Sequence, residues 1–445
     1  MESTKSLEAV KKLLAPKKLS YVEEKVFLQT LGGQLYREMA LETGYEEGYL
    51  KDVGSQLWHS LSAKLGRQVT KKNLRAILTE VCELKSFVIN HYLQPGDAFA
   101  KLDFPGSPLP VGSTFYVERP PVEDLALSTL HQTGSLIRIK APLCMGKTSL
   151  INHLLGVAHQ AGIYPVLVDM QQADTAALNN LDQFLRWFCW TIGQQLNMDA
   201  KFDEYWIESA GSKLGCTTYL QEYILKWVSQ PIVVAIDKIH YLMRYPELAS
   251  NFFPMLRSWY EQARVREVWQ KLRLIIAHST QLEMPLQVNQ SPFNVGLPLT
   301  LSEFTAAQIN DLAERYELHK VGIHDFPALK PLLKLVGGHP YLLQLAFYWL
   351  RSGHLTLAQL LQEAPTDQGI YGEHLRYLWL TLQRDETLMQ AFHTVLSSPL
   401  PVALDTAIAY QLEGMGLVQI HGMKVSLRYE LYRQYFSAHL EGTYG

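Results

Sequence analysis

A glycine-containing loop between a predicted strand and a predicted helix is the feature that most restricts how this chain can fold. The loop spans residues 141–148 and has the spacing Ala-x-x-x-x-Gly-Lys-Thr, with alanine where a phosphate-binding loop usually has its first glycine. Residues 135–140 before the loop predict a short strand, and residues 148–155 after it predict a helix. In this context, the loop's backbone N–H groups and the helix N-terminus bind anionic phosphates.

The residues of this loop have distinct expected roles. Lys147 is expected to reach the outer phosphates with its ammonium group, and Thr148 to offer its hydroxyl to Mg²⁺. The sequence therefore predicts a nucleotide site. Its predicted phosphate-binding residues are Ala141, Met145, Gly146, Lys147, Thr148 and Ser149.

A second element supports this prediction. The continuous apolar run 231–236 ends at Asp237, which is typical of a central parallel strand buried on both faces. Its carboxylate would emerge at the C-terminal end of the sheet, where ligands of open α/β sheets bind. Asp237 is therefore predicted to join Thr148 as a magnesium ligand.

The residue after this acid is unusual. Lys238 stands where hydrolysing phosphate-loop proteins usually carry the glutamate that polarises the attacking water. A lysine with an ordinary pKa of about 10.4 is protonated at neutral pH and cannot act as that base. We expect its ammonium group to lie near the γ-phosphate and beside the Asp237 carboxylate. His240 is an alternative base, although an ordinary loop histidine is the more frequent case. The sequence argues for nucleotide binding more strongly than for hydrolysis.

Composition sets wider limits. A length of 445 residues allows about two to four domains, and a net charge of −3 gives no overall attraction to nucleic acid or an acidic membrane surface. No run reaches the ~18 apolar residues of a membrane helix, so no membrane partner is expected. The cysteines form no C-x-x-C pair, which predicts neither a disulfide framework nor a zinc site and fits a cytoplasmic location. They are Cys82, Cys144, Cys189 and Cys216.

Residues 1–86 are predicted to form an all-helical domain. Residues 35–58 have the layout of helix, glycine turn and helix, as in a helix-turn-helix. Through Lys85 this part holds fourteen Lys and Arg against eleven Asp and Glu, although the whole chain is acidic. Glu46 and Glu47 begin the second helix, where acids stabilise the helix dipole but repel DNA. DNA binding and a protein-binding role are equally open for this domain.

The rest of the chain alternates strands with helices and then becomes mainly helical. Further strands are predicted at residues 163–169 and 272–280, and the alternation implies a parallel sheet in a three-layer α/β core. Two short strands around residues 421–422, after several helices, suggest a winged helix. The expected domains are a helix-turn-helix domain at 1–86, a linker at 87–110, a P-loop NTPase core at 111–300, a helical lid at 301–365 and a winged helix at 366–445.

Seven short stretches occur together in an order that one family shares: residues 116–120, 141–149, 235–237, 277–280, 291–296, 337–340 and 430–435. With these stretches, the chain from about residue 104 onward resembles the bacterial AAA-like family of STAND-type P-loop NTPases. The N-terminal region resembles the helix-turn-helix domain of proteins associated with vWA and MoxR systems. The ordered set is much more specific than the phosphate loop alone.

The resemblance implies an AAA+/STAND-like core that binds ATP or ADP between core and helical lid. Members of such families often act in signal transduction as regulated switches that assemble. The resemblance also implies that residues 116–120, with Tyr116 and Arg119 among them, lie near the adenine. Ser279 or Thr280 would occupy the first sensor position, and Pro340 would touch the base or ribose from the lid.

The chain departs from the family pattern at the site itself. The family commonly has a polar, basic pair where this chain has Leu143 and Cys144, a glutamate at Lys238, and an acid at His240. A degraded hydrolysis site beside an intact phosphate loop predicts an ATP-binding regulatory or scaffolding protein with weak or absent ATPase activity. It would switch homo-oligomer assembly or the binding of a protein partner. The alternatives are an active ATPase signalling switch and a DNA-binding transcriptional regulator.

Overall fold

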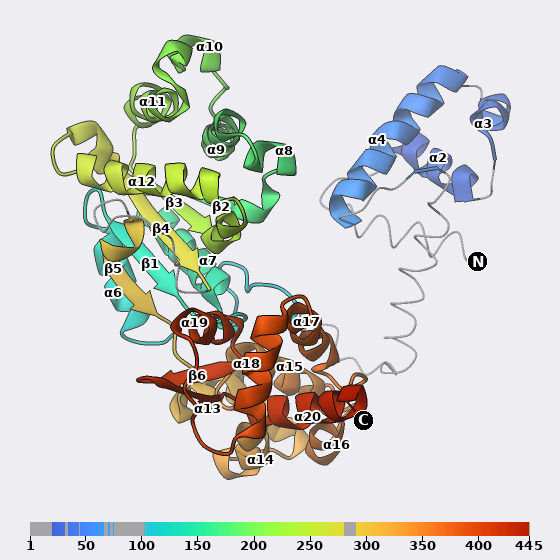
Figure 1. Cartoon of the computed structure of the whole chain (residues 1–445). Coiled ribbons are helices and arrows are strands. Elements are labelled where there is room, and N and C mark those ends of the chain that lie inside the picture. The colour runs from blue at the N-terminus through green and yellow to red at the C-terminus, as the bar shows by residue number, and fades with distance from the viewer. Residues whose placement is uncertain are drawn as a thin grey trace. The chain divides into compact units, whose positions relative to one another are not determined.

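The computed structural model describes residues 20–31, 34–43, 45–65, 70–71, 74, 102, 104–279 and 291–444. The chain divides into two compact units, Met1–Ala100 and Lys101–Gly445. Figure 1 shows the helices of the first unit in blue, and the sheet and helices of the second in the remaining colours. In these described ranges, no helix is long and apolar enough to cross a membrane.

Three helices pack around a small apolar core in the described part of the first unit: α2 (Tyr21–Leu31), α3 (Tyr36–Thr43) and α4 (Glu47–Leu65). Ser20 and Glu23 form a reciprocal cap at the start of α2, with backbone-to-side-chain bonds of 2.8 and 3.2 Å. The core consists of fully buried side chains from all three helices: Val26, Phe27, Met39, Leu50, Leu57 and Leu61. The α3–α4 pair confirms the predicted helix-turn-helix.

The second unit is built on a parallel sheet with strand order β2-β3-β4-β1-β5. Every residue of β3 and β4 is buried, as their continuous apolar sequences predicted. The strands are β1 (Leu136–Lys140), β2 (Tyr164–Asp169), β3 (Ile232–Asp237), β4 (Leu272–His278) and β5 (Leu297–Thr300).

Helices cover both faces of this sheet and make a three-layer core (Figure 1). On one face, α6 (Val122–Leu130) and α7 (Lys147–Gln160) share an apolar cluster with Ile137, Ile139, Val233, Ala235, Ile275 and Ala277. On the other face, α9 (Leu181–Gln195) and α12 (Pro246–Gln262) share a cluster with Val166, Val168, Val234, Ile236, Leu274 and Ile276. Alternate residues of a strand therefore point to opposite faces, and the predicted α/β class is confirmed.

Several helices and turns connect β2 to β3, and one turn follows β3. The chain between these strands forms 3₁₀ turn η2 (Met170–Gln172), α8 (Thr175–Leu178), α9, α10 (Phe202–Tyr205), 3₁₀ turn η3 (Glu208–Ala210), α11 (Ser212–Thr218) and a π-helix at Tyr219–Leu225. After β3 the chain forms the 3₁₀ turn η5 (Ile239–Arg244). Turns η2 and η5 contact each other, so the C-terminal ends of β2 and β3 are held side by side.

The helical lid follows β5. It contains α13 (Ala306–Arg315), the 3₁₀ turn η8 (Leu318–Val321), α14 (Phe326–Val336), α15 (Pro340–Arg351) and α16 (Leu357–Glu363). Two of its helices begin with a capping box, formed by Thr305 with Gln308 and by Thr356 with Gln359. These caps fix where α13 and α16 start.

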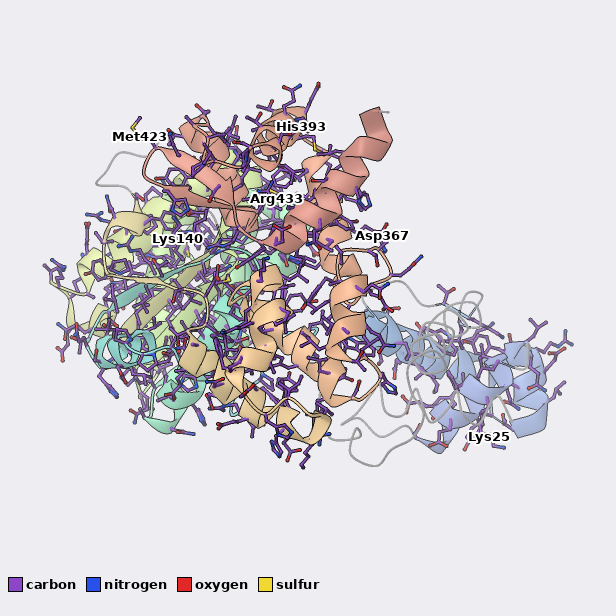
Figure 2. All side chains as sticks on the ribbon, turned by 90° about the horizontal axis from the view of Figure 1, so that it is seen from below. Lys25, Lys140, Asp367, His393, Met423 and Arg433 are labelled. Atoms are coloured by element: carbon purple, nitrogen blue, oxygen red, sulfur yellow. The ribbon has the colours of Figure 1, made fainter. Side chains whose placement is uncertain are left out.

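The C-terminal part has the elements of a winged helix. They are α17 (Gly372–Leu382), α18 (Glu386–Ser397), α19 (Thr406–Met415), β6 (Val418–His421), β7 (Lys424–Leu427) and α20 (Glu430–Tyr444). β6 and β7 pair antiparallel, and Val402 adds a bridge to Val425 of β7. Met423 lies at the tip of the wing, 93% exposed, and points outward (Figure 2). The predicted winged helix is confirmed.

Candidate nucleotide-binding site

The phosphate loop joins β1 to α7 and has the backbone that such a loop requires. Gly146, directly before α7, has a φ of +90°, a conformation that glycine adopts without strain. A Cβ atom there would lie only 3.2 Å from the Arg119 guanidinium. Ala141 is buried and lies outside the residues with positive φ, so this position has no need of glycine. Alanine is therefore compatible with the loop.

The two predicted magnesium ligands meet. The Thr148 hydroxyl donates a hydrogen bond to the Asp237 carboxylate at 2.7 Å. The Lys147 ammonium lies over its own loop and donates to the carbonyls of Ala141 and Pro142 at 2.8 and 2.6 Å. Burial lowers the pKa of Lys147 to about 8 and raises the pKa of Asp237. Both shifts disfavour charge, a cost that phosphate anions and a divalent cation would offset.

The residues present fit a magnesium-bound nucleotide. Mg²⁺ is usually held by one or two carboxylates together with phosphate oxygens and water, which suits Asp237 with Thr148 beside it. Across the described ranges, no three His, Cys, Asp or Glu side chains cluster as an alternative metal site. Within those same ranges, Arg119 Nε and His240 Nδ1 are buried without a hydrogen-bond partner, so polar atoms are left for a ligand to satisfy.

The Lys238 side chain contacts a different acid from the expected one. Its ammonium donates to Asp169 at 2.7 Å and to the Gln171 side chain at 2.8 Å. Asp169 ends β2 and lies opposite Asp237 in the strand register. The ammonium was expected beside the Asp237 carboxylate, but its hydrogen bonds go to Asp169 and Gln171, because the neighbouring strand places a second carboxylate within its reach. The Lys238 backbone N–H, rather than the ammonium, donates to Asp237 at 2.8 Å.

His240 is a poor base in this environment. Burial, and next the positive charge of Lys147, lower its pKa to about 4. The imidazole is therefore neutral at pH 7 but binds a proton only weakly. This result weakens the alternative in which His240 replaces the glutamate.

Tyr116 and Arg119 lie together against the start of α7. The Arg119 guanidinium donates to the Met145 carbonyl at 2.9 Å. The Tyr116 ring stacks on His153 of α7, with ring centroids 4.5 Å apart. Glu123 holds both residues. One of its carboxylate oxygens accepts a hydrogen bond from the Tyr116 hydroxyl at 2.8 Å, and the other accepts one from the backbone N–H of Arg119 at 2.9 Å. Sequence reasoning missed Glu123, which has no motif spacing to reveal it.

Pro340 is buried at the start of α15, and the glycines before it are anchored by Glu303. Glu303 accepts a hydrogen bond from the Gly338 N–H at 3.0 Å and another from the Tyr429 hydroxyl at 2.7 Å. The Arg428 guanidinium donates to the same carboxylate at 3.3 Å. Glu303 therefore joins the end of the core, the lid and the winged helix. It was not among the predicted site residues, because its partners are distant in sequence.

The winged helix touches the phosphate loop directly. The Leu143 N–H donates to the Gly414 carbonyl in the last turn of α19 at 3.1 Å. Lys140, labelled in Figure 2, lies 3.7 Å from the Glu413 carboxylate and over the Tyr410 ring. Part of the loop's backbone and the end of β1 are therefore engaged by α19. No local sequence pattern predicts this contact.

The remaining predicted residues are Ser279, Thr280 and Ser149. Ser279 is buried directly after β4, on the edge where Asp237 ends β3, whereas Thr280 lies outside the described residues. The Ser149 hydroxyl accepts from the Leu109 N–H at 3.0 Å, and Asn152 donates to the Leu109 carbonyl at 2.8 Å. Residues 104–110, predicted as linker, thus include a stretch that is fixed to α7.

Comparison with known proteins identifies the family and the fold. The model of the AAA-like domain matches residues 104–438, and the model of the vWA-MoxR associated protein N-terminal HTH matches residues 1–81. The Walker-type ATPase PABY2304 of Pyrococcus abyssi has a similar fold over 74% of this chain and 99% of its own, at 13% identity and a TM-score of 0.52. The ORC2 protein of Aeropyrum pernix, solved in ADPNP–ADP complexes, covers 75% of this chain and 99% of its own, at 13% identity and a TM-score of 0.41.

No curated protein is similar enough in sequence to count as a relative. The likeness to solved structures concerns the fold, because the identity is low. The first family model, however, spans well over half of the chain, and the phosphate loop, parallel sheet, lid and winged helix all follow the expected order. The chain belongs to the AAA-like domain family of P-loop NTPases and carries an N-terminal helix-turn-helix domain.

Proposed function

We propose that this protein is a nucleotide-dependent switch that binds ATP or ADP with Mg²⁺, hydrolyses ATP slowly, and changes its assembly or partner binding with the bound nucleotide. The loop N–H groups and Lys147 would hold the phosphates, and Thr148 with Asp237 would hold the metal. A bound Mg²⁺ would neutralise phosphate charge. Tyr116 and Arg119, fixed by Glu123, support a base site on the α7 side of the loop.

Slow hydrolysis follows from the groups around Asp237. Lys238 is a cation at the position of the usual base, and its ammonium is bonded to Asp169. The Asp169 carboxylate is thus already occupied by the Lys238 ammonium. His240 has a pKa of about 4. Proton transfer from water to any of these groups would be inefficient at neutral pH.

The contact between Leu143 and Gly414 carries the proposal of a switch. The Leu143 N–H is bonded to α19, so a change in the loop's conformation around phosphates would affect the winged helix. The Glu303 contacts extend this coupling to the lid. Nucleotide binding and the arrangement of lid and winged helix would therefore be linked in both directions.

Two measurements test the proposed function. The nucleotide released when the purified protein is denatured should be ATP or ADP, identified by chromatography. Phosphate release by the wild type should stay far below the ~1 per second at the low end of typical enzymes. Lys238→Glu should raise it if the remaining site is competent, and Lys147→Ala should abolish what remains. If the wild type hydrolyses ATP rapidly and Lys147→Ala abolishes this activity, the proposal of slow hydrolysis is contradicted and the protein is an active ATPase.

A further inference from the structure

Lys238 lies between two acids at the ends of neighbouring strands. Asp169 ends β2 and Asp237 ends β3, and the two residues are direct partners in the parallel register. Asp237 is bonded to Thr148 of the phosphate loop, so it marks the metal side of the site. Asp169 is bonded to the Lys238 ammonium at 2.7 Å, on the side away from the loop. The ammonium is therefore paired with the acid that ends β2, and not with the acid that ends β3 beside the phosphate loop.

The backbone of Lys238 holds its side chain in an unusual way. Its φ is +54°, in the left-handed region that strains a residue with a Cβ. Such strain persists at functional sites when the surroundings enforce it. The Lys238 N–H bond to Asp237 and the ammonium bonds to Asp169 and Gln171 supply that enforcement. The side chain is about one-third exposed, so it has room to move.

Lys238 directly follows Asp237, whose carboxylate accepts hydrogen bonds from the Thr148 hydroxyl of the phosphate loop and from the Lys238 backbone N–H. The Lys238 side chain therefore starts one residue from the side of the site that would hold the metal and the γ-phosphate. A lysine is a compact charge on a flexible four-carbon stem and can exchange partners readily. A γ-phosphate next to Lys147 would offer more negative charge than the Asp169 carboxylate, whereas ADP would not.

We propose that Lys238 distinguishes ATP from ADP by exchanging Asp169 for the γ-phosphate. With ADP or no nucleotide, the ammonium stays on Asp169 and Gln171. With ATP it moves to the γ-phosphate, and Asp169 keeps its bond from the Gln171 N–H, 3.0 Å long in this structure. The exchange makes the end of β2 respond to the third phosphate. This inference rests on the proposed nucleotide site.

The test compares affinities for a non-hydrolysable ATP analogue and for ADP, both with Mg²⁺, by calorimetry on the full chain. Lys238→Met keeps the length of the side chain and removes its charge. It should lower the ratio of ATP-analogue to ADP affinity about tenfold, the size of one charge-assisted hydrogen bond. Asp169→Asn should raise the ratio, because the competing carboxylate is gone. In the double variant, the ratio should equal that of Lys238→Met alone.

Lys226→Met is the matched control, because Lys226 forms an ion pair with Glu222 elsewhere on the same unit, at 3.2 Å. It should leave the ratio unchanged. The proposal is overturned if Lys238→Met lowers the affinities for the ATP analogue and for ADP equally. It is also overturned if Asp169→Asn changes the affinity ratio as much in the Lys238→Met background as in the wild type. Failure of the wild type to bind either nucleotide contradicts the proposed function itself. Equal binding by the wild type and Lys147→Ala contradicts it in the same way.

Discussion

Lys147 is the residue on which the nucleotide site most depends. Its ammonium is held by two carbonyls of its own loop, which positions it over the loop for phosphates. Lys147→Ala should weaken ATP binding at least about tenfold, because charge-assisted hydrogen bonds to phosphate are lost. Calorimetry measures the change, with the exposed Lys334→Ala on α14 as control. Equal affinity of Lys147→Ala and the wild type would contradict the phosphate-loop assignment.

The pKa of Lys147 also predicts how binding depends on pH. Burial lowers this pKa to about 8, so the free protein loses the proton above that pH. Phosphate favours the charged form, so the complex keeps the proton over a range where the free protein does not. ATP affinity should therefore fall above about pH 8, by up to about tenfold per pH unit, and binding should take up a proton. Calorimetry in buffers of different ionisation enthalpy measures this uptake.

Lys147→Arg is the control for the pH effect, because a guanidinium stays charged throughout this range. It should lose the dependence on pH even if its affinity is lower. Affinity of the wild type that is constant from about pH 7 to 9.5 would show that Lys147 is already charged in the free protein.

At the scale of elements, Glu303 joins three parts of the second unit. Glu303→Ala would leave the Gly338 N–H and the Tyr429 hydroxyl without this partner, and Arg428 without its counter-ion. We expect the local free energy of opening to fall by about 1–3 kcal/mol, measured as faster hydrogen exchange in residues 337–345. The exposed Glu314→Ala on α13 is the matched control. Unchanged exchange in Glu303→Ala would mean that packing alone holds the lid.

The same lid segment should respond to nucleotide. If Pro340 packs on the base or ribose, ATP raises the free energy of local opening, because only the closed lid makes this contact. Hydrogen exchange in residues 337–345 should therefore slow when ATP is added, and should not slow in Lys147→Ala. If ATP does not slow hydrogen exchange in these residues of the wild type, the lid does not close on the nucleotide.

The elements themselves were largely predictable from the sequence, and the contacts between them were not. Runs of apolar residues located β2, β3 and β4, because strands buried on both faces need such sequences. The sequence motifs also predicted that Thr148 and Asp237 lie close together, and their side chains are hydrogen-bonded. The partner of Lys238 depended on which strand lies beside β3, and that order is set by the whole fold. The contact of α19 with Leu143 is also a tertiary property without a local sequence signal.

At the scale of the whole molecule, the winged helix and the helix-turn-helix domain are the two parts that could contact DNA. The helix before the wing, α19, is engaged by the phosphate loop through Leu143 and Lys140. It carries one acid, Glu413, and no Lys or Arg. A helix with this charge and this contact is poorly suited to the DNA phosphate backbone. We therefore expect any DNA contact to be made by the helix-turn-helix domain rather than by α19.

Among the described residues of that domain, several apolar and aromatic side chains are exposed. Leu41 is 81% exposed, and the half-exposed rings of Tyr45 and Tyr49 lie 5.6 Å apart. Lys51 on α4 is paired with Glu47 at 2.7 Å, so its charge is already compensated. An exposed apolar and aromatic surface beside compensated charges is typical of a protein contact.

We therefore expect the full chain to bind duplex DNA weakly, with micromolar or poorer affinity near physiological salt and no preference for sequence. Each phosphate that is neutralised adds about 0.9 to the slope of log affinity against log salt, so fluorescence anisotropy over a salt series counts the contacts. Glu46→Gln together with Glu47→Gln should tighten this binding, because two repelling charges are removed from the start of α4. Glu430→Gln on α20 is the control. Nanomolar, sequence-selective binding by the wild type would contradict the protein-contact interpretation and make the chain a DNA-binding regulator.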